Sequence, residues 1–79
     1  MALTEARLVQ YLRHKTGMEE LDAKTTLFSD GTVDSVGMVD LIVFIESEAG
    51  FEIAQEDVTM DNFDTVSRIL ALVATRAAE

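Results

Sequence analysis

The sequence contains no cysteine and no proline, and it has a single histidine, His14. Without cysteine the chain forms no disulfide, holds no zinc through thiolates and has no cysteine nucleophile. A lone histidine makes no metal site, and no Gly-x-Ser-x-Gly elbow accompanies it as in a serine hydrolase. These absences leave the chain poorly equipped for catalysis of its own.

Basic residues are also scarce, because 6 lysines and arginines stand against 15 acidic residues, for a net charge of −9. That charge argues against a nucleic-acid partner and favours protein partners with basic docking patches. No apolar run approaches the roughly 20 residues that a bilayer crossing needs. The first residues also lack the basic region and apolar run of a signal peptide. We therefore expect a cytoplasmic protein with no membrane partner.

The length of 79 residues is enough for one domain, so residues 1–79 are expected to form a single unit with a thin core. Three segments have the apolar spacing of amphipathic helices. The first begins after the N-cap Thr4 and ends near Gly17, with an inner face of Leu8, Val9 and Leu12. The second begins at Ser35 and ends at Gly50, with an inner face of Met38, Leu41, Ile42, Ile45 and Ala49. The last is expected to be capped by Asp64 and repeats Val66, Ile69, Leu70 and Val73.

The connections between these helices differ in length. Residues 18–33 lose the helical period and form a long loop, whose expected anchors are Leu21, Leu27 and Phe28. Residues 51–62 leave room for a short further helix or turn, with Ile53, Val58 and Met60 as expected core contacts. The pattern predicts an all-α fold: a small antiparallel bundle of three main helices plus a short fourth.

The second helix has an apolar stripe on the face opposite its core face. Val36, Val39 and Val43 lie there between the acidic residues Asp40 and Glu46. Either another element of the fold or a partner must cover these valines. Because the helix already has a face for the core, we favour a partner. An apolar strip edged by acidic residues is typical of a transient docking surface.

A serine stands where the long loop becomes the second helix, in the segment Asp30-Gly31-Thr32-Val33-Asp34-Ser35-Val36. At a helix start a phosphate on this hydroxyl would face unpaired backbone N–H groups and the positive end of the helix dipole. The simplest alternative is that Asp34 and Ser35 only cap the helix. A calcium-binding EF-hand loop beginning at Asp30 does not fit, because Ser35 and Leu41 occupy its glycine and glutamate positions.

This segment resembles the prosthetic-group site of acyl and peptidyl carrier proteins, with Val36 in place of the usual leucine. The resemblance continues through the acidic end of the second helix and through Gly50-Phe51-Glu52-Ile53 and Phe63-Asp64-Thr65-Val66, so it covers nearly the whole chain. It implies that Ser35 carries 4′-phosphopantetheine transferred from coenzyme A. It also implies that Asp34 offers a carboxylate to the modifying transferase, beside its capping role.

The implied function is that of a discrete carrier protein, not an enzyme, holding an acyl or aminoacyl cargo as a thioester. The implied partners are a phosphopantetheinyl transferase, an acyl or aminoacyl ligase or acyltransferase, and a ketosynthase or other transfer enzyme, each meeting a monomeric carrier. The Asp-Ser-hydrophobe-Gly pattern is similar to D-alanyl carrier proteins and to carriers of secondary metabolism. The residues leave open whether the pathway makes fatty acids, polyketides or nonribosomal peptides. The competing interpretation is a small acidic helical interaction or regulatory module, with Ser35 as a helix cap or a phosphorylation site.

Overall fold

The computed structural model describes residues 3–29 and 31–77. Its helices, in chain order, are α1 (Glu5–Thr16), α2 (Ser35–Ala49), the 3₁₀ helix η1 (Gln55–Asp57), α3 (Met60–Phe63) and α4 (Val66–Ala77). Strands are absent from the described residues. Three long helices and a short fourth confirm the expected all-α bundle.

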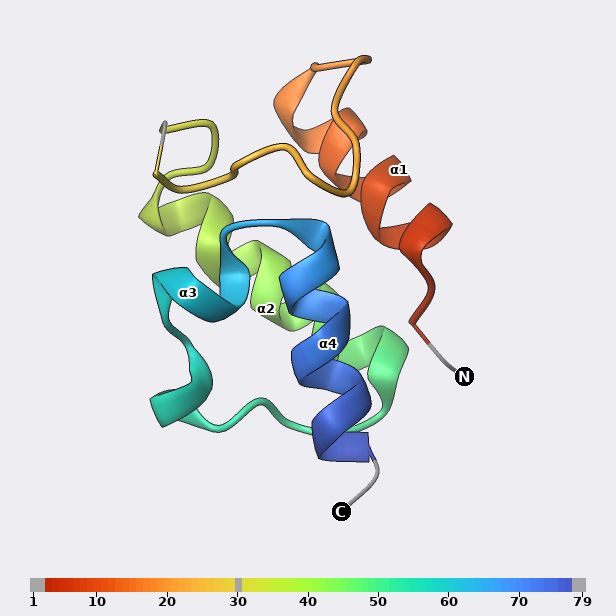
Figure 1. The fold of residues 1–79 in the computed structure, drawn as a ribbon, viewed down its shortest axis with the longest axis vertical. Helices are drawn as coiled ribbons and strands as arrows, with labels where there is room; N and C mark the ends of the chain where they lie inside the picture. Colours follow the sequence, from red (N-terminus) through yellow and green to blue (C-terminus); the bar gives the residue numbers. More distant parts are fainter. Residues whose placement is uncertain (1–2, 30, 78–79) are drawn as a thin grey trace.

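The helices pack around α4, which contacts both α1 and α3. Figure 1 shows α4 crossing in front of α2, with the long loop between α1 and α2 passing over one end of the bundle. The same view shows this loop lying next to the turn that joins α3 to α4. The start of α2 therefore emerges from a loop supported by the C-terminal part of the chain.

The ends of α1 and α2 follow the expected capping chemistry. The hydroxyl oxygen of Thr4 accepts the N–H of Arg7 at 3.2 Å, which satisfies one unpaired donor in the first turn of α1. Gly17 and Gly50 end α1 and α2 with φ of 73° and 84°, a left-handed conformation that a side chain disfavours. The helix boundaries predicted from the sequence are confirmed at these positions.

The core draws residues from the three long helices and also from the loop. The side chains of Leu21 and Leu27 have no exposed surface, so two of the three expected loop anchors are fully buried. The other fully buried residues come from the helices and from the end of α3: Leu8, Leu12, Leu41, Ile45, Phe63, Val66 and Ile69. The loop is therefore part of the hydrophobic core.

Two expectations about the last third of the chain are wrong. Asp64 does not cap α4, because Thr65 accepts the N–H of Arg68 at 3.2 Å and the carboxylate of Asp64 binds the long loop instead. Met60 is 54% exposed, so it is not a core contact. The burial of Phe63 at the end of the same short helix supplies the core contact from α3.

An ion pair fixes η1 to α4. Arg76 binds the carboxylate of Asp57 through two hydrogen bonds of 2.7 Å, and Asp57 is buried. Bidentate geometry makes this pair stronger than an ordinary surface salt bridge. It holds the connection between α2 and α3 against the C-terminal half of α4.

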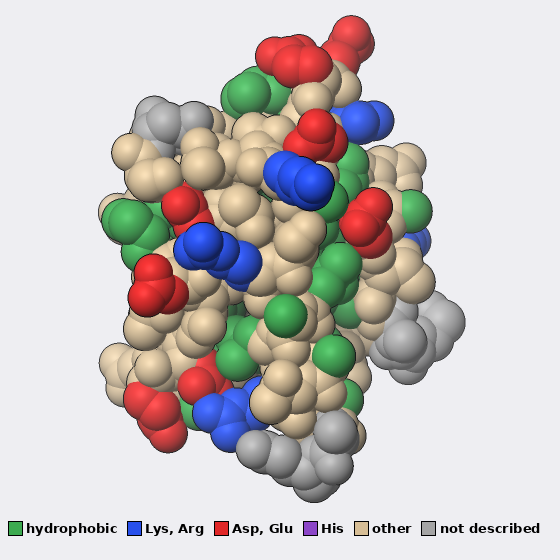
Figure 2. Space-filling view, in the orientation of Figure 1, with side chains coloured by type: hydrophobic (Ala, Val, Ile, Leu, Met, Phe, Trp, Pro, Cys, Tyr) green, Lys and Arg blue, Asp and Glu red, His purple; other side chains and the backbone are tan. Residues whose placement is uncertain are grey.

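The surface on the α4 side is mixed in charge. Figure 2 shows acidic and basic side chains lying among one another on this face, with small apolar areas between them. Across the described ranges, no helix combines the length and apolar character that crossing a bilayer would require.

The burial of Leu41 generates a stability prediction. Leu41→Ala should lower the free energy of unfolding by about 2–5 kcal/mol, because it removes a fully buried side chain from a small core. Urea unfolding followed by circular dichroism measures the change. Val43→Ala is the matched control, since Val43 is 60% exposed on the same helix and should change stability by about 0.5 kcal/mol or less. Equal losses in the two variants would contradict the observed rotation of α2.

Candidate functional site

Ser35 is the first residue of α2 and is exposed, as the sequence predicted. Asp34 precedes it as the N-cap, and its Oδ1 accepts the N–H of Gly37 at 2.8 Å. Among the described residues, the hydroxyl of Ser35 has no hydrogen-bond partner. The side chain of Asp34 caps the helix, so the hydroxyl of Ser35 remains available to other molecules.

Gly37 leaves room for a close approach next to this cap. A Cβ at position 37 would lie 2.9 Å from Cγ1 of Val33 and 3.4 Å from Oδ1 of Asp34. The first of these distances is too short for two carbon atoms. Glycine therefore lets Val33 and the capping carboxylate pack against the first turn of α2.

Two hollows flank the start of α2. One, of about 340 Å³, contains Ser35 itself and is otherwise lined by Phe28, Val33, Asp34, Met38 and Met60. The other, of about 420 Å³, lies on the α1 side and is lined in part by Lys15, Thr32 and Asp40. A group attached to the exposed hydroxyl would have open space beside it. A phosphate there would also lie near the N–H groups of the first helical turn, so the residues present fit a phosphate-linked group.

The valine stripe of α2, formed by Val36, Val39 and Val43, is exposed along its length. These side chains are 71%, 61% and 60% exposed, so no described element of the fold covers them. Leu41 and Ile45 on the opposite face are fully buried. Of the two explanations that the sequence left open, cover by another part of the described fold is excluded.

The two acidic residues beside the stripe differ in their contacts. Asp40 faces Lys15 of α1 at 3.6 Å, and both side chains are about half exposed, so this pair is weak. Glu46 has a structural contact that the sequence did not indicate, since its Oε2 accepts the N–H of Ile53 at 2.8 Å. Asp40 is therefore the acidic residue more available to a partner.

Other chemistry near Ser35 is not supported. His14 is exposed on α1, and the Ser35 hydroxyl donates no hydrogen bond to a described histidine or carboxylate. Within residues 3–29 and 31–77, no three His, Asp or Glu side chains cluster as metal ligands. Asp30, the first residue of the rejected calcium loop, lies outside the described residues. Among the described residues, the site offers an accessible hydroxyl and no hydrogen-bonded base that would activate it.

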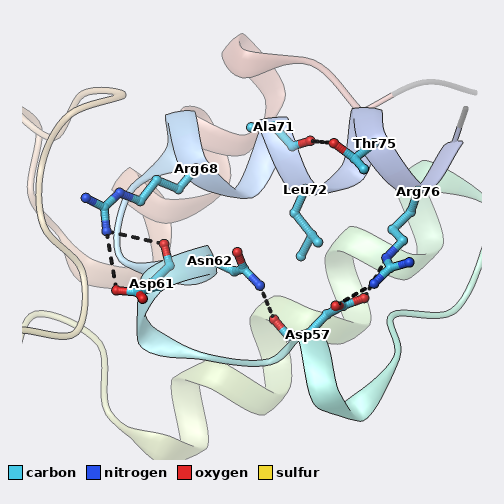
Figure 3. Close-up of a pocket in the computed structure, with 8 residues that line it drawn as sticks. All are labelled: Asp57, Asp61, Asn62, Arg68, Ala71, Leu72, Thr75 and Arg76. Atoms are coloured by element: carbon cyan, nitrogen blue, oxygen red, sulfur yellow. Dashed lines mark hydrogen bonds and ion pairs between the residues drawn. The ribbon is translucent and has the colours of Figure 1, made fainter.

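A further hollow of about 710 Å³ lies between α3 and α4, away from Ser35, and is drawn in Figure 3. Its charged side chains are already engaged. Arg76 binds Asp57, while Arg68 reaches the backbone oxygen of Asp61 at 3.3 Å and its carboxylate at 4.0 Å. These contacts stabilise the α3–α4 side of the fold and provide no nucleophile.

Comparison with known proteins gives one family. Residues 6–73 match the family model described as a phosphopantetheine attachment site. A D-alanyl carrier protein from Abiotrophia defectiva is 38% identical over 60 residues, which cover 76% of this chain and 73% of that protein. The probable acyl carrier protein PigG from a Serratia strain is 38% identical over 53 residues, which cover 67% of this chain and 61% of that protein.

The fold has a counterpart in a crystal structure of a Bradyrhizobium japonicum glycine:[carrier protein] ligase complexed with a glycylated carrier protein. The TM-score is 0.67 at 22% sequence identity, and the match covers 86% of this chain and 96% of the other. At this identity the likeness supports the fold alone.

The cap on α2 generates a second prediction. Asp34→Ala should lower the free energy of unfolding by about 0.5–2 kcal/mol, because the N–H of Gly37 loses its acceptor. Asp34→Asn is the matched variant and should remain close to the wild type, since asparagine caps helices as well as aspartate. Chemical unfolding of the three proteins tests this, and an alanine variant as stable as the asparagine variant would mean that the cap contributes nothing.

Proposed function

We propose that this chain, which belongs to the family of proteins with a phosphopantetheine attachment site, uses Ser35 as the attachment residue. The family match spans residues 6–73, and the cofactor of this carrier protein is 4′-phosphopantetheine. The family carries a prosthetic group and is not itself catalytic. The proposal takes residues 1–79 as one carrier domain that presents this group to other enzymes.

The surroundings of the four serines support Ser35 as the attachment residue. Ser29 donates its hydroxyl to Asp64 at 2.8 Å, so that oxygen already has a partner. Ser47 and Ser67 lie within α2 and α4, away from a helix start preceded by an acidic residue. Ser35 alone combines exposure, the first position of a helix and a preceding aspartate.

The chain's own part in the proposed chemistry is limited to one oxygen. In the transfer from coenzyme A, the Ser35 oxygen would bond to the phosphorus that bears the pantetheine, the pyrophosphate linkage of coenzyme A would break, and adenosine 3′,5′-bisphosphate would leave. A transferase would have to supply the base that takes the serine proton, because none of the described residues contacts this hydroxyl. The group, once attached, supplies the terminal thiol that a chain without cysteine lacks. Asp34 would cap α2 through Oδ1 and offer its other carboxylate oxygen, Oδ2, to the transferase.

We propose that the cargo is an acyl or aminoacyl group carried as a thioester and shuttled between enzymes. The relatives named as D-alanyl and acyl carrier proteins support this range. The proposed partners are a phosphopantetheinyl transferase, an acyl or aminoacyl ligase or acyltransferase, and a ketosynthase or other transfer enzyme. Tethering raises the effective concentration of the cargo at each docked enzyme.

We propose that partners dock on the valine stripe, with Asp40 and Glu46 at its edges. The stripe starts one residue after Ser35, so an enzyme that grips it has the attachment point beside the contact. The valines would supply the apolar contact, and the excess of acidic residues would attract basic partners over distance. Such a contact suits a carrier that must leave each partner quickly.

The attachment proposal is tested with Ser35→Ala. Incubation with coenzyme A and a broad-specificity phosphopantetheinyl transferase should add the mass of one prosthetic group to the wild type and none to the variant. Intact-mass spectrometry gives the readout, and a normal melting curve shows that the variant is folded. If the folded alanine variant gains the group, Ser35 is not the attachment residue.

The docking proposal is tested by charge reversal. Asp40→Lys should lower kcat/KM for loading or modification by about tenfold or less at low salt, because a basic partner then meets a like charge. The difference from wild type should shrink as ionic strength rises. Steady-state kinetics in a salt series measure both effects.

Glu5→Lys is the matched control, since Glu5 is exposed in the first turn of α1 and the reversal changes the net charge equally. It should change the kinetics little. Equal impairment by the two reversals would reject the docking surface in favour of overall charge. If the difference between Asp40→Lys and the wild type does not shrink as ionic strength rises, only the electrostatic attraction of partners is rejected. Val43→Asp then tests whether the valines contact the partner.

A further inference from the structure

Asp64, at the junction of α3 and α4, binds a loop segment that lies 35 and 36 positions earlier in the chain. Its Oδ1 accepts the N–H groups of Phe28 and Ser29, each at 3.0 Å. Its Oδ2 accepts the hydroxyl of Ser29 at 2.8 Å. Three donors on one carboxylate form a charge-assisted set of hydrogen bonds, which are stronger than neutral ones.

The backbone strengthens this junction. The N–H of Leu27 donates to the carbonyl oxygen of Asp64 at 2.7 Å, and the N–H of Ser67 donates to the carbonyl oxygen of Ala23 at 3.0 Å. The loop thus donates a backbone hydrogen bond to the α3–α4 junction and accepts one from the first turn of α4. Because the side chain of Leu27 is also fully buried, this residue is held by packing and by hydrogen bonding together.

A second set of contacts runs from the junction to the start of α2. The carbonyl oxygen of Leu27 accepts the N–H of Val33 at 2.7 Å, and that of Phe28 accepts the N–H of Gly31 at 3.1 Å. Val33 directly precedes the capping Asp34. Phe28 and Val33 also line the hollow that contains Ser35. Asp64 therefore reaches the wall of the candidate site directly through Phe28 and indirectly, by way of Leu27, through Val33.

We propose that Asp64 is a positioning residue for the modification of Ser35, acting through Leu27, Phe28 and Val33. It fixes the loop that delivers the serine to the start of α2 and the wall beside it, so that a transferase meets a preformed site. This inference rests on the proposed attachment at Ser35 and adds a residue that lies 29 positions later in the sequence. The helix that follows does not need Asp64, since Thr65 caps it.

The ionised carboxylate is the form that makes these contacts. Hydrogen bonds from Ser29 and Phe28 hold the pKa of Asp64 below the usual range of an aspartate. Its stabilising effect is therefore complete above the pKa of the unfolded chain and is lost as the pH falls through the lowered, folded-state pKa. Assays near neutral pH measure the fully formed junction.

The test compares the kinetics of Asp64→Ala and Asp64→Asn with the wild type, using coenzyme A and a broad-specificity phosphopantetheinyl transferase. Asp64→Ala should lower kcat/KM for the carrier by about 10- to 100-fold, because small displacements of a reacting group are costly. Asp64→Asn should stay close to the wild-type rate, because its amide oxygen can accept the two N–H groups that Oδ1 accepts now. A wild-type rate in Asp64→Asn would show that the hydrogen-bond acceptor at position 64 matters for modification and that its negative charge does not.

Amide hydrogen exchange separates positioning from general unfolding. In Asp64→Ala the N–H of Val33 should lose protection, while core amides such as those of Leu41 and Ile69 keep theirs. If the alanine variant does not fold, Ser29→Ala decides the matter, because it removes only the hydroxyl contact and should give a smaller but measurable loss of rate. Wild-type modification kinetics in a folded Asp64→Ala variant, or in Ser29→Ala if Asp64→Ala does not fold, would overturn the proposal. An asparagine variant as slow as a folded alanine variant would also overturn it. Failure of the wild type to be modified at Ser35 would instead reject the attachment proposal itself.

Discussion

The candidate site depends on how Leu27 is held between the two halves of the chain. Its side chain is fully buried, its N–H binds the carbonyl oxygen of Asp64, and its own carbonyl oxygen binds the N–H of Val33. Packing in the core holds the Leu27 side chain, and the two hydrogen bonds hold its backbone. Because Val33 directly precedes the N-cap Asp34, these hydrogen bonds connect the start of α2 to the junction of α3 and α4.

The second constraint is the division of α2 into two faces with different roles. Leu41 and Ile45 are fully buried and stabilise the bundle, while Val39 and Val43 on the other side remain exposed. The buried side chains are needed for stability, because a small domain can lose few of them without unfolding. The exposed valines add little to stability. The proposed docking role would explain why β-branched apolar residues occupy that surface.

Local patterns in the sequence were enough to predict the long helices, the cap residues Thr4, Gly17 and Gly50, and the exposed serine. Helical periodicity and capping preferences are carried by residues a few positions apart, so they can be read without knowing the fold. The contacts that were missed join distant or irregular segments: Asp64 binds the long loop, and Glu46 binds the N–H of Ile53. From the sequence, an aspartate just before a helix is expected to be its N-cap. Only the tertiary structure shows that Thr65 caps α4 instead of Asp64.

The most direct test of the account is to locate the prosthetic group on the wild-type chain. Trypsin leaves all four serines on one peptide, residues 25–68, so tandem mass spectrometry must fragment this peptide after treatment with coenzyme A and a transferase. The account predicts one phosphopantetheinyl group, on Ser35. A group on Ser29, Ser47 or Ser67 would contradict it. So would an unmodified chain under conditions in which the same transferase modifies a known carrier protein.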